Sequence, residues 1–295
     1  MVNPWKYAVI TPVKNEARFL PQTIASMVCQ SVLPLVWMVV DDASTDTSAE
    51  IIKACERRYP WVRYLLHPGE AARKTGSAEI HAFDYGFQAL GSLDFDFIVK
   101  LDGDLRFEAD YFETLLSRFS GQKNLGIASG IYLEVAGPFW EPVKMPGYHA
   151  AGASKVVRRE CFEQIGGFIA QRGWDTIDEI RAQAKGWDTA HFPDIQFYHL
   201  RKEGAGMGQL HTSIMHGEIF YRSGGSFLFF VAKALDRIFR GKPAVLAGAA
   251  MIYGYIRSWW KRQVKLVTPL EERTYRSLLS RRILGLLKPA FIVRP

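Results

Sequence analysis

The sequence contains the segment Phe95-Asp96-Phe97-Ile98-Val99-Lys100-Leu101-Asp102-Gly103-Asp104, in which an apolar run ends in two carboxylates around a glycine. Its aromatic and β-branched residues predict a buried strand over residues 95–101. Asp102 and Asp104 stand where that strand ends, and their hard oxygens suit Mg²⁺ or Mn²⁺. Gly103 leaves room for a bulky ligand near the backbone. The segment therefore predicts a strand that presents a divalent-cation site.

The preceding residues alternate between strand and helix signals. Apolar runs predict strands over residues 7–11, 36–40 and 62–66. Helical spacing of apolar residues predicts helices over residues 19–30, 45–59 and 77–89. Ser44 or Thr45 is expected to cap the second of these helices. Such alternation indicates βαβ units, so we expect an α/β fold with a Rossmann-like, mostly parallel sheet flanked by helices.

Polar side chains follow three of the four predicted strands. They are Lys14, Asn15 and Glu16 after the first, Asp41 and Asp42 after the second, and Asp102 and Asp104 after the fourth. Ligands of open α/β sheets bind beyond the carboxyl ends of the strands. Four carboxylates from two strand ends repel one another unless a cation or a ligand offsets them. A binding site is therefore favoured over the alternative that these aspartates only cap helices.

Two common phosphate-binding motifs are absent from the sequence. It has no GxxxxGK[ST] loop and no GxGxxG after the first strand, which argues against a kinase, a GTPase or a classical dinucleotide-dependent dehydrogenase. Lys74, at the start of a predicted helix, is a candidate cation for a bound phosphate. The equal alternative is that its segment, residues 74–77, is a plain helix cap.

Composition and length also narrow the class of protein. The chain has 295 residues, of which 48% are hydrophobic and 23% charged, as in ordinary globular proteins. Its three cysteines form no CxxC pair, and no apolar leader precedes the first strand. These features predict a protein that stays in the cytoplasm.

The C-terminal part of the chain differs from the rest in charge. Residues 231–295 contain 14 lysines and arginines against 3 acidic residues, a net charge of +11. Since the whole chain carries +7, the first 230 residues carry −4. An acidic body with a basic tail indicates an anionic partner. No recognition motif accompanies the basic residues, so nucleic acid is not expected to be that partner.

The tail also contains an uncharged apolar run over residues 243–256, followed by Arg257, Trp259, Trp260 and Lys261. This run is too short to span a bilayer alone, whereas tryptophan and basic residues at its end suit the headgroup level. We expect a catalytic domain over residues 1–222 and a basic, apolar helical tail over residues 223–295 that associates with a membrane surface. The alternative is a core helix with a solvated basic face.

Taken in order, the motifs resemble those of family 2 nucleotide-sugar glycosyltransferases, which have the GT-A fold. The matching segments are residues 9–16, 40–46, 74–77, 100–104, 158–162, 166–168 and 174–179. The resemblance covers about residues 5–205 and implies a GT-A-like sheet with a C-terminal helical extension. Each motif is weak by itself, and the ordered set is specific.

The resemblance implies a nucleotide pocket and a metal site. Residues expected to border the base and ribose are Thr11, Pro12, Asn15 and Glu16. Asp41 or Asp42 would accept a hydrogen bond from the base. Asp102 would lie near the ribose or metal, and Asp104 would ligate the Mn²⁺ or Mg²⁺ that bridges the diphosphate. His199 stands where similar enzymes often have a histidine on the metal or diphosphate, a structural role being the equal alternative.

The resemblance further implies a general base on a helix. Asp175 matches that base, but Trp174 precedes it where the family usually has glutamate, and Asp178 and Glu179 lie only one turn away. The choice of base therefore stays open, with Asp175 and Asp178 as the catalytic candidates. Alternatively, Asp175 only caps the helix. Trp174 either faces a sugar ring or belongs to the core.

These expectations combine into one predicted function. It is inverting, metal-dependent transfer of a sugar from a nucleotide donor, with a UDP-sugar expected, to a saccharide or lipid-linked saccharide in surface polysaccharide synthesis. One carboxylate would deprotonate the acceptor hydroxyl, and a metal ion would take up charge on the leaving diphosphate. Two alternatives remain: transfer to a polyprenyl phosphate, which needs no base, and a sugar-nucleotide-binding protein without catalysis.

Overall fold

The computed structural model describes residues 5–69, 78–201, 208–240 and 245–283. The chain divides into two compact units, residues 1–202 and residues 203–295. Lys74 lies outside the described residues.

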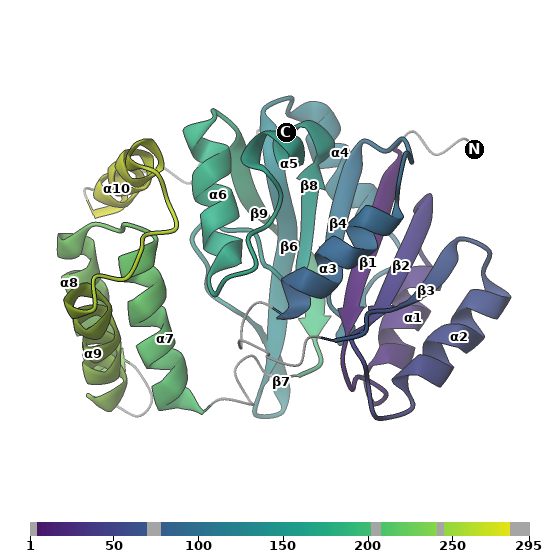
Figure 1. The fold of residues 1–295 in the computed structure, drawn as a ribbon, viewed down its shortest axis with the longest axis horizontal. Helices are drawn as coiled ribbons and strands as arrows, with labels where there is room; N and C mark the ends of the chain where they lie inside the picture. The colour runs from purple at the N-terminus through teal and green to yellow at the C-terminus, as the bar shows by residue number, and fades with distance from the viewer. Residues whose placement is uncertain (1–4, 70–77, 202–207, 241–244, 284–295) are drawn as a thin grey trace. The chain divides into compact units, whose positions relative to one another are not determined.

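The first unit is a sheet with helices on both faces (Figure 1). Its elements are β1 (Tyr7–Val13), α1 (Leu20–Val28), β2 (Val36–Asp41), α2 (Ser48–Arg58), β3 (Val62–Leu66), α3 (Ala78–Ala89), β4 (Phe97–Leu101), β5 (Leu105–Phe107), α4 (Tyr111–Gly121), β6 (Leu125–Ala136), β7 (Phe139–Pro142), β8 (Ser154–Arg158), α5 (Arg159–Ile165), α6 (Trp174–Ala184) and β9 (Asp188–His199).

The strands form one mixed sheet in the order β3-β2-β1-β4-β8-β6-β9-β5, with β7 paired to β6. The pairs among β1, β2, β3 and β4 are parallel, which confirms the predicted α/β fold. Beyond β4 the sheet changes direction, because β8 runs antiparallel to β4 and β6 antiparallel to β8. β9 is parallel to β6, and β5 is antiparallel to β9.

The core follows the two-residue period of the strands. Tyr7 and Val9 of β1 belong to one apolar cluster, which includes residues of α1, α2 and α4. Ala8 and Ile10 belong to another, which includes residues of α3, α5 and α6. Because both faces of β1 are covered, its residues read as a continuous apolar run, as is usual for a buried parallel strand.

The loops after β1 and β2 are tied together. The Asn15 backbone N–H donates to the Ser44 hydroxyl at 3.0 Å, and the Asn15 side-chain oxygen accepts the Thr45 N–H at 2.8 Å. Since Ser44 and Thr45 serve this connection, neither caps α2, and the predicted cap is wrong. The helix begins at Ser48 after Thr47, and the Asp46 carboxylate accepts the Ser48 N–H at 3.0 Å.

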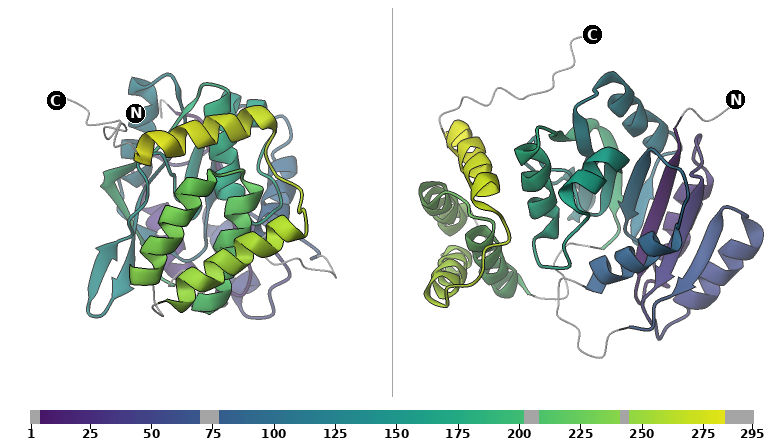
Figure 2. Two further views of the ribbon diagram at one scale, coloured as in Figure 1. Left: turned by 90° about the vertical axis from the view of Figure 1, so that its left-hand side faces the viewer. Right: turned by 45° about the horizontal axis from the view of Figure 1, so that its top comes forward.

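The second unit consists of four described helices (Figure 2). They are α7 (Gln209–Arg222), α8 (Phe227–Arg240), α9 (Leu246–Trp260) and α10 (Pro269–Ile283). The division between the units lies before α7, whereas the sequence placed the domain boundary after residue 222. α7 belongs to the second unit because it packs closely along α9.

Glycines allow the close packing of α7 on α9. A Cβ atom on Gly217 would lie 2.0 Å from the Met251 carbonyl oxygen, and one on Gly254 would lie 2.0 Å from the Ile214 carbonyl oxygen. Phe230 of α8 stacks on Tyr255 of α9 with ring centroids 4.2 Å apart. Within the described residues, none of the helices combines the length and apolar character needed to cross a membrane.

Gly130 of β6 provides a test of the packing in the first unit. A Cβ atom there would lie 2.4 Å from the Ile195 carbonyl oxygen of β9, so Gly130→Ala forces backbone to move. We expect a loss of about 1–3 kcal/mol in the free energy of unfolding, measured by thermal and urea denaturation. Gly121→Ala is the matched control, because a Cβ atom there meets nothing within 4 Å. Equal effects of the two substitutions would contradict the packing described.

Candidate active site

The turn between β4 and β5 carries Asp102 and Asp104, and hydrogen bonds from other elements fix it. The Thr23 hydroxyl of α1 lies 2.8 Å from the Gly103 carbonyl oxygen and accepts the Leu105 N–H at 3.0 Å. The Asp102 N–H donates to the Ala153 carbonyl at 2.8 Å. Both carboxylates are therefore held by a backbone that is pinned on two sides.

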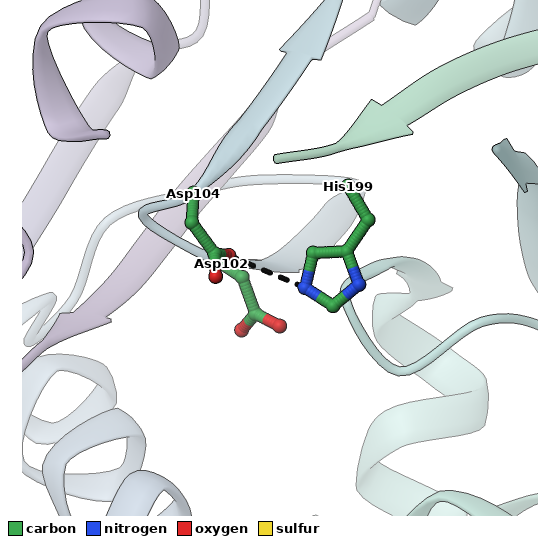
Figure 3. A group of neighbouring side chains, drawn as sticks. All are labelled: Asp102, Asp104 and His199. Carbon is green, nitrogen blue, oxygen red and sulfur yellow. Dashed lines mark ion pairs between the residues drawn. The ribbon is translucent and has the colours of Figure 1, made fainter. Parts of the chain in front are cut away.

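Asp102, Asp104 and His199 form a cluster whose potential ligand atoms lie within 4.8 Å of one another (Figure 3). His199 is the last residue of β9 and stands opposite Leu105 in the sheet. Its Nε2 atom lies 3.5 Å from an Asp104 oxygen, and its Nδ1 atom lies 3.7 Å from a Glu134 oxygen. Among the residues that the structure describes, the buried Nδ1 atom has no hydrogen-bond partner.

The donor set fits a divalent cation. Two carboxylates supply hard, negatively charged oxygens, and an imidazole supplies a nitrogen. A ligating histidine usually directs its second nitrogen toward a carboxylate, and Glu134 lies on that side of His199. The sequence proposed Asp104 and His199 as ligands and Asp102 near the ribose or metal, and the structure brings all three together.

The charges around this cluster are concentrated and partly buried. Arg201 pairs with Glu16, and its Nε atom lies 3.4 Å from Asp104. Burial, together with the charge of Asp104, raises the pKa of Glu16 to about 7 in spite of Arg201. Burial also raises the pKa of Asp102 to about 6, although Lys100 acts in the opposite direction. Crowded carboxylates of this kind favour the binding of a cation.

The same carboxylates act on the pKa of His199. Burial alone would lower the pKa of its imidazole, but the hydrogen bond with Asp104 and the charges of Asp104, Asp102 and Glu134 outweigh burial. The pKa of His199 is therefore raised above its ordinary value.

A cavity of about 240 Å³ opens beside the cluster. The described residues that line it are Pro12, Val13, Lys14, Glu16, Asp42, Ala78, Glu79, Ala82, Asp102, Gly103 and Asp104. Five of the predicted nucleotide or metal residues are thus in one pocket at the carboxyl ends of β1, β2 and β4. This is where open α/β sheets bind their ligands.

Three other residues predicted to bind the nucleotide are not among the described residues that line this pocket. Their side chains make hydrogen bonds to neighbouring residues. Thr11 is buried, and its hydroxyl accepts the Trp37 indole N–H at 2.8 Å. Asp41 accepts the Ser44 N–H at 2.9 Å and faces the Tyr64 hydroxyl at 3.3 Å. Asn15 joins the loops after β1 and β2.

His67 contacts the pocket residue Asp42 and was not predicted from the sequence. Its Nδ1 atom lies 2.9 Å from an Asp42 oxygen, and its ring packs edge-on against Tyr85 at 5.2 Å. His67 directly follows β3, so its signal in the sequence is its place after a strand, like that of Asp42 after β2. Of the two adjacent aspartates, Asp42 faces the pocket with a histidine behind it, and Asp41 serves the turn.

The three carboxylates of α6, the helix predicted to carry the general base, differ in burial. α6 begins at Trp174 after Gly173, so Asp175 lies in the first turn and is not the N-cap. The Asp175 side chain is 35% exposed, whereas those of Asp178 and Glu179 are 1% and 2% exposed. Of the three, only Asp175 can readily meet a molecule from solvent.

Lys155 of β8 neutralises the two buried carboxylates. Its Nζ atom lies 3.0 Å from Asp178 and 3.3 Å from Glu179, and it donates to the Asp175 carbonyl at 2.8 Å. A second buried lysine, Lys100 of β4, stands directly opposite Lys155 in the antiparallel pair. Lys100 binds Asp102 at 2.5 Å and Glu79 at 3.5 Å.

Trp174 connects the two lysines. Each Nζ atom lies 5.2 Å from the indole ring, within cation–π range. The indole N–H donates to Glu79 at 2.7 Å, and the residue is only 5% exposed. Trp174 is therefore a core residue, in agreement with the second of the two roles considered for it.

Asp175 and the Asp102 turn lie at the same end of the sheet. A Cβ atom on Gly152 would lie 3.4 Å from the Asp175 Cβ, and the next residue, Ala153, accepts the Asp102 N–H. His149, in the same loop, places Nε2 4.0 Å from an Asp175 oxygen and Nδ1 3.0 Å from Glu179. One short loop thus contacts both carboxylate groups.

The fold and the site define an α/β protein with a pocket of about 240 Å³, an acidic cluster that could hold a cation and a partly exposed carboxylate at the same end of the sheet. Residues 8–172 match the model of the family described as glycosyl transferase family 2. Because the match spans more than half of the chain, the protein belongs to this family.

A curated glycosyltransferase and several solved structures are similar to this chain. The chain is 29% identical over 152 residues to glycosyltransferase GlyA of Streptococcus pneumoniae, a match that spans 50% of this chain and 19% of that protein. It is similar in fold to mannosyltransferase PcManGT from Pyrobaculum calidifontis in complex with GDP-Man and Mn2+, with a TM-score of 0.58, 17% identity and coverage of 99% and 92% of the two chains. It is also similar to S. aureus TarS 1–349 in complex with UDP-GlcNAc, with a TM-score of 0.55, 14% identity and coverage of 95% and 92%. The predicted GT-A-like fold is thereby confirmed.

Asp104→Ala tests the cation site. Loss of one of two carboxylates should abolish the stabilisation that Mn²⁺ gives to the protein, while the melting temperature without metal stays within a few degrees. Titration with MnCl₂, followed by thermal shift and by the electron paramagnetic resonance signal of free Mn²⁺, measures both effects. Asp110→Ala is the control, since Asp110 is exposed before α4 and makes no capping hydrogen bond. An unchanged metal response would remove Asp104 from the site.

Proposed function

We propose that the protein is an inverting, metal-dependent glycosyltransferase that moves a hexosyl group from a nucleoside diphosphate sugar, with UDP as the nucleotide, to a hydroxyl group. The observation that carries the proposal is the meeting of the Asp102–Asp104–His199 cluster and the exposed Asp175 at one end of the sheet. The acceptor is a saccharide or lipid-linked saccharide of surface polysaccharide synthesis, presented at the cytoplasmic face of a membrane.

The donor side of the reaction belongs to the pocket beside β1, β2 and β4. Asp42, with His67 behind it, accepts an N–H of the nucleotide base, and Pro12 and Glu16 border the base and ribose. Mn²⁺ or Mg²⁺, held by Asp102, Asp104 and His199, would neutralise charge that grows on the leaving diphosphate. Binding of UDP-sugars and GDP-sugars by proteins of this fold supports the choice of donor class.

The acceptor side belongs to Asp175. Its carboxylate takes the proton of the acceptor hydroxyl as the acceptor oxygen bonds to the anomeric carbon and the bond from that carbon to the diphosphate oxygen breaks. Attack from the side opposite the diphosphate inverts the anomeric configuration. Exposure distinguishes Asp175 from Asp178 and Glu179, which are buried against Lys155.

A panel of nucleoside diphosphates, each with and without Mn²⁺, tests the donor. A ligand that binds only the folded protein stabilises it by about 2.7 kcal/mol at one hundred times its dissociation constant, so the right nucleotide stands out in a thermal-shift assay. UDP is expected to give the largest shift. Binding without donor hydrolysis or transfer would instead indicate a non-catalytic sugar-nucleotide-binding protein.

Asp175→Asn is expected to lower kcat by about 10²–10⁴-fold, the usual contribution of a general base, with UDP binding and melting temperature unchanged. Asp178→Asn is the matched substitution, because it removes the charge of a buried partner of Lys155. It should lower the melting temperature and reduce kcat less than Asp175→Asn does. Initial rates of transfer and thermal denaturation separate the two effects. Full turnover in Asp175→Asn would favour a polyprenyl phosphate acceptor, which is already ionised.

His149 acts on Asp175 as a positioning residue in this proposal. The charged groups that face its ring are Glu179, Asp175 and Lys155, and the His191 ring contacts its carbonyl. Burial alone would lower the pKa of His149, but Glu179 and Asp175 outweigh burial and Lys155, and the pKa is raised. A cationic ring at this place puts a positive charge 4.0 Å from an Asp175 oxygen.

Because the cationic form of His149 acts on Asp175, kcat should fall as the pH rises through the raised pKa of His149, and His149→Gln should remove that fall from the profile. We expect kcat at neutral pH to fall about tenfold, with the donor KM unchanged. Rate measurements from pH 5 to 9 give both quantities. His191→Gln is the control, and a merely structural role for His149 would lower stability and leave the pH profile where it is.

A further inference from the structure

The second unit exposes large apolar side chains along one side of α8. Leu228, Val231, Leu235 and Phe239 recur at the spacing of one helical face, and all four are exposed. Leu228 is 75% exposed and Phe239 80%. The charged residues Lys233, Asp236 and Arg237 fall on another side of the helix at 100° per residue. α8 is thus amphipathic with its apolar side turned outward.

α9 has the same outward-facing pattern. Leu246, Ala249, Tyr253, Ile256 and Trp260 share one side and are all exposed, Trp260 to 79%. The opposite side, which packs within the unit, consists of Ala247, Gly248, Met251, Gly254 and Ser258. Apart from Met251, the inward residues of α9 are therefore small, and its large exposed apolar residues face outward.

This distribution reverses that of a helix in an aqueous bundle, where the large apolar side chains form the core. Small residues at helix contacts, such as Gly254 against Ile214 and Gly217 against Met251, are typical of helices whose outer surface meets lipid. The start of α9 lies at the end of α8, since the Val245 N–H donates to the Ile238 carbonyl at 3.0 Å. The exposed residues Phe239, near the end of α8, and Leu246, at the start of α9, therefore lie close together.

Basic charge accompanies the apolar sides. Exposed Arg257, Lys261 and Arg262 flank Trp259 and Trp260 at the end of α9, within a stretch whose net charge is +11. Tryptophan beside lysine and arginine is the composition of segments that sit at the headgroup level. A polybasic cluster of this kind is attracted to anionic lipids. Two copies of this chain meeting here would bring like charges together, which argues for a lipid occupant.

We propose that the exposed apolar sides of α8 and α9, with the basic cluster Arg257–Lys261–Arg262, form a surface that docks on an anionic lipid bilayer. With 14 and 15 residues, α8 and α9 are each about 22 Å long, short of the roughly 30 Å hydrocarbon core, which suits helices lying in the interface. The inference deepens the proposed function, because it names the surface that would hold the enzyme at a membrane. It rests on the proposed function only for that location.

Vesicle co-sedimentation of the full chain tests the surface. The protein should bind vesicles of phosphatidylcholine with 30% phosphatidylglycerol and bind pure phosphatidylcholine at least tenfold more weakly. Leu228→Ser with Phe239→Ser on α8, and Trp260→Ser on α9, should each reduce binding about tenfold or more, since each removes large apolar area. Phe139→Ser is the matched control, because Phe139 is a 69% exposed aromatic residue of β7 in the first unit.

A second set of variants tests the charge without touching the apolar sides. Replacing Arg257, Lys261 and Arg262 together by Gln should weaken binding to the anionic vesicles about fivefold per charge and reduce its salt dependence. The matched control replaces Arg57, Lys123 and Lys185 of the first unit by Gln, three exposed basic residues away from the pocket.

Three outcomes would overturn the inference. They are no binding to anionic vesicles, binding that the apolar variants leave unchanged, and a dimer in sedimentation analysis that the apolar variants convert to a monomer. The last would make a second copy the occupant. Donor hydrolysis is measured on the same protein preparations without vesicles. A protein that docks but has no transferase activity, or one that has activity but does not dock, separates this inference from the proposed function.

Discussion

Two buried ammonium groups hold together the end of the sheet that carries the pocket. Lys100 and Lys155 face each other across β4 and β8 beneath Trp174, and each is matched by carboxylates from other elements. An unpaired charge in such a position costs several kcal/mol, so the lysines and their partners must assemble together. Lys100 binds Asp102, and Lys155 binds the carbonyl of Asp175 at the start of α6. The lysine pair therefore couples the geometry of the cation cluster to that of Asp175.

The parallel half of the sheet was predictable mainly because β1, β2 and β4 are covered on both faces and therefore read as apolar runs. The remaining strands were harder to predict. β7 is mostly exposed, and β6 and β9 form a parallel pair with irregular register whose partners lie far apart in sequence. The boundary before α7 depends on glycine contacts with α9, which no local pattern reveals.

Within the site, the position after a strand predicted the residues that line the pocket, such as Asp42 and Asp104. It did not distinguish them from Asp41 and Thr11, because that difference depends on hydrogen bonds to Ser44 and Trp37. Lys100 and Lys155 did give a signal: a lysine within an apolar strand requires a buried partner. His149 gave none, since only the folding of its loop onto α6 brings it to Asp175.

The position of His199 at the end of β9 has a consequence for synthesis of the protein. β9 enters the sheet between β6 and β5, so the short strand after Asp104 has no neighbour on that side until β9 arrives. During translation, the two aspartates leave the ribosome nearly a hundred residues before the imidazole. A nascent chain therefore cannot assemble the cluster early, and the complete cluster forms only when the last strand of the first unit is in place.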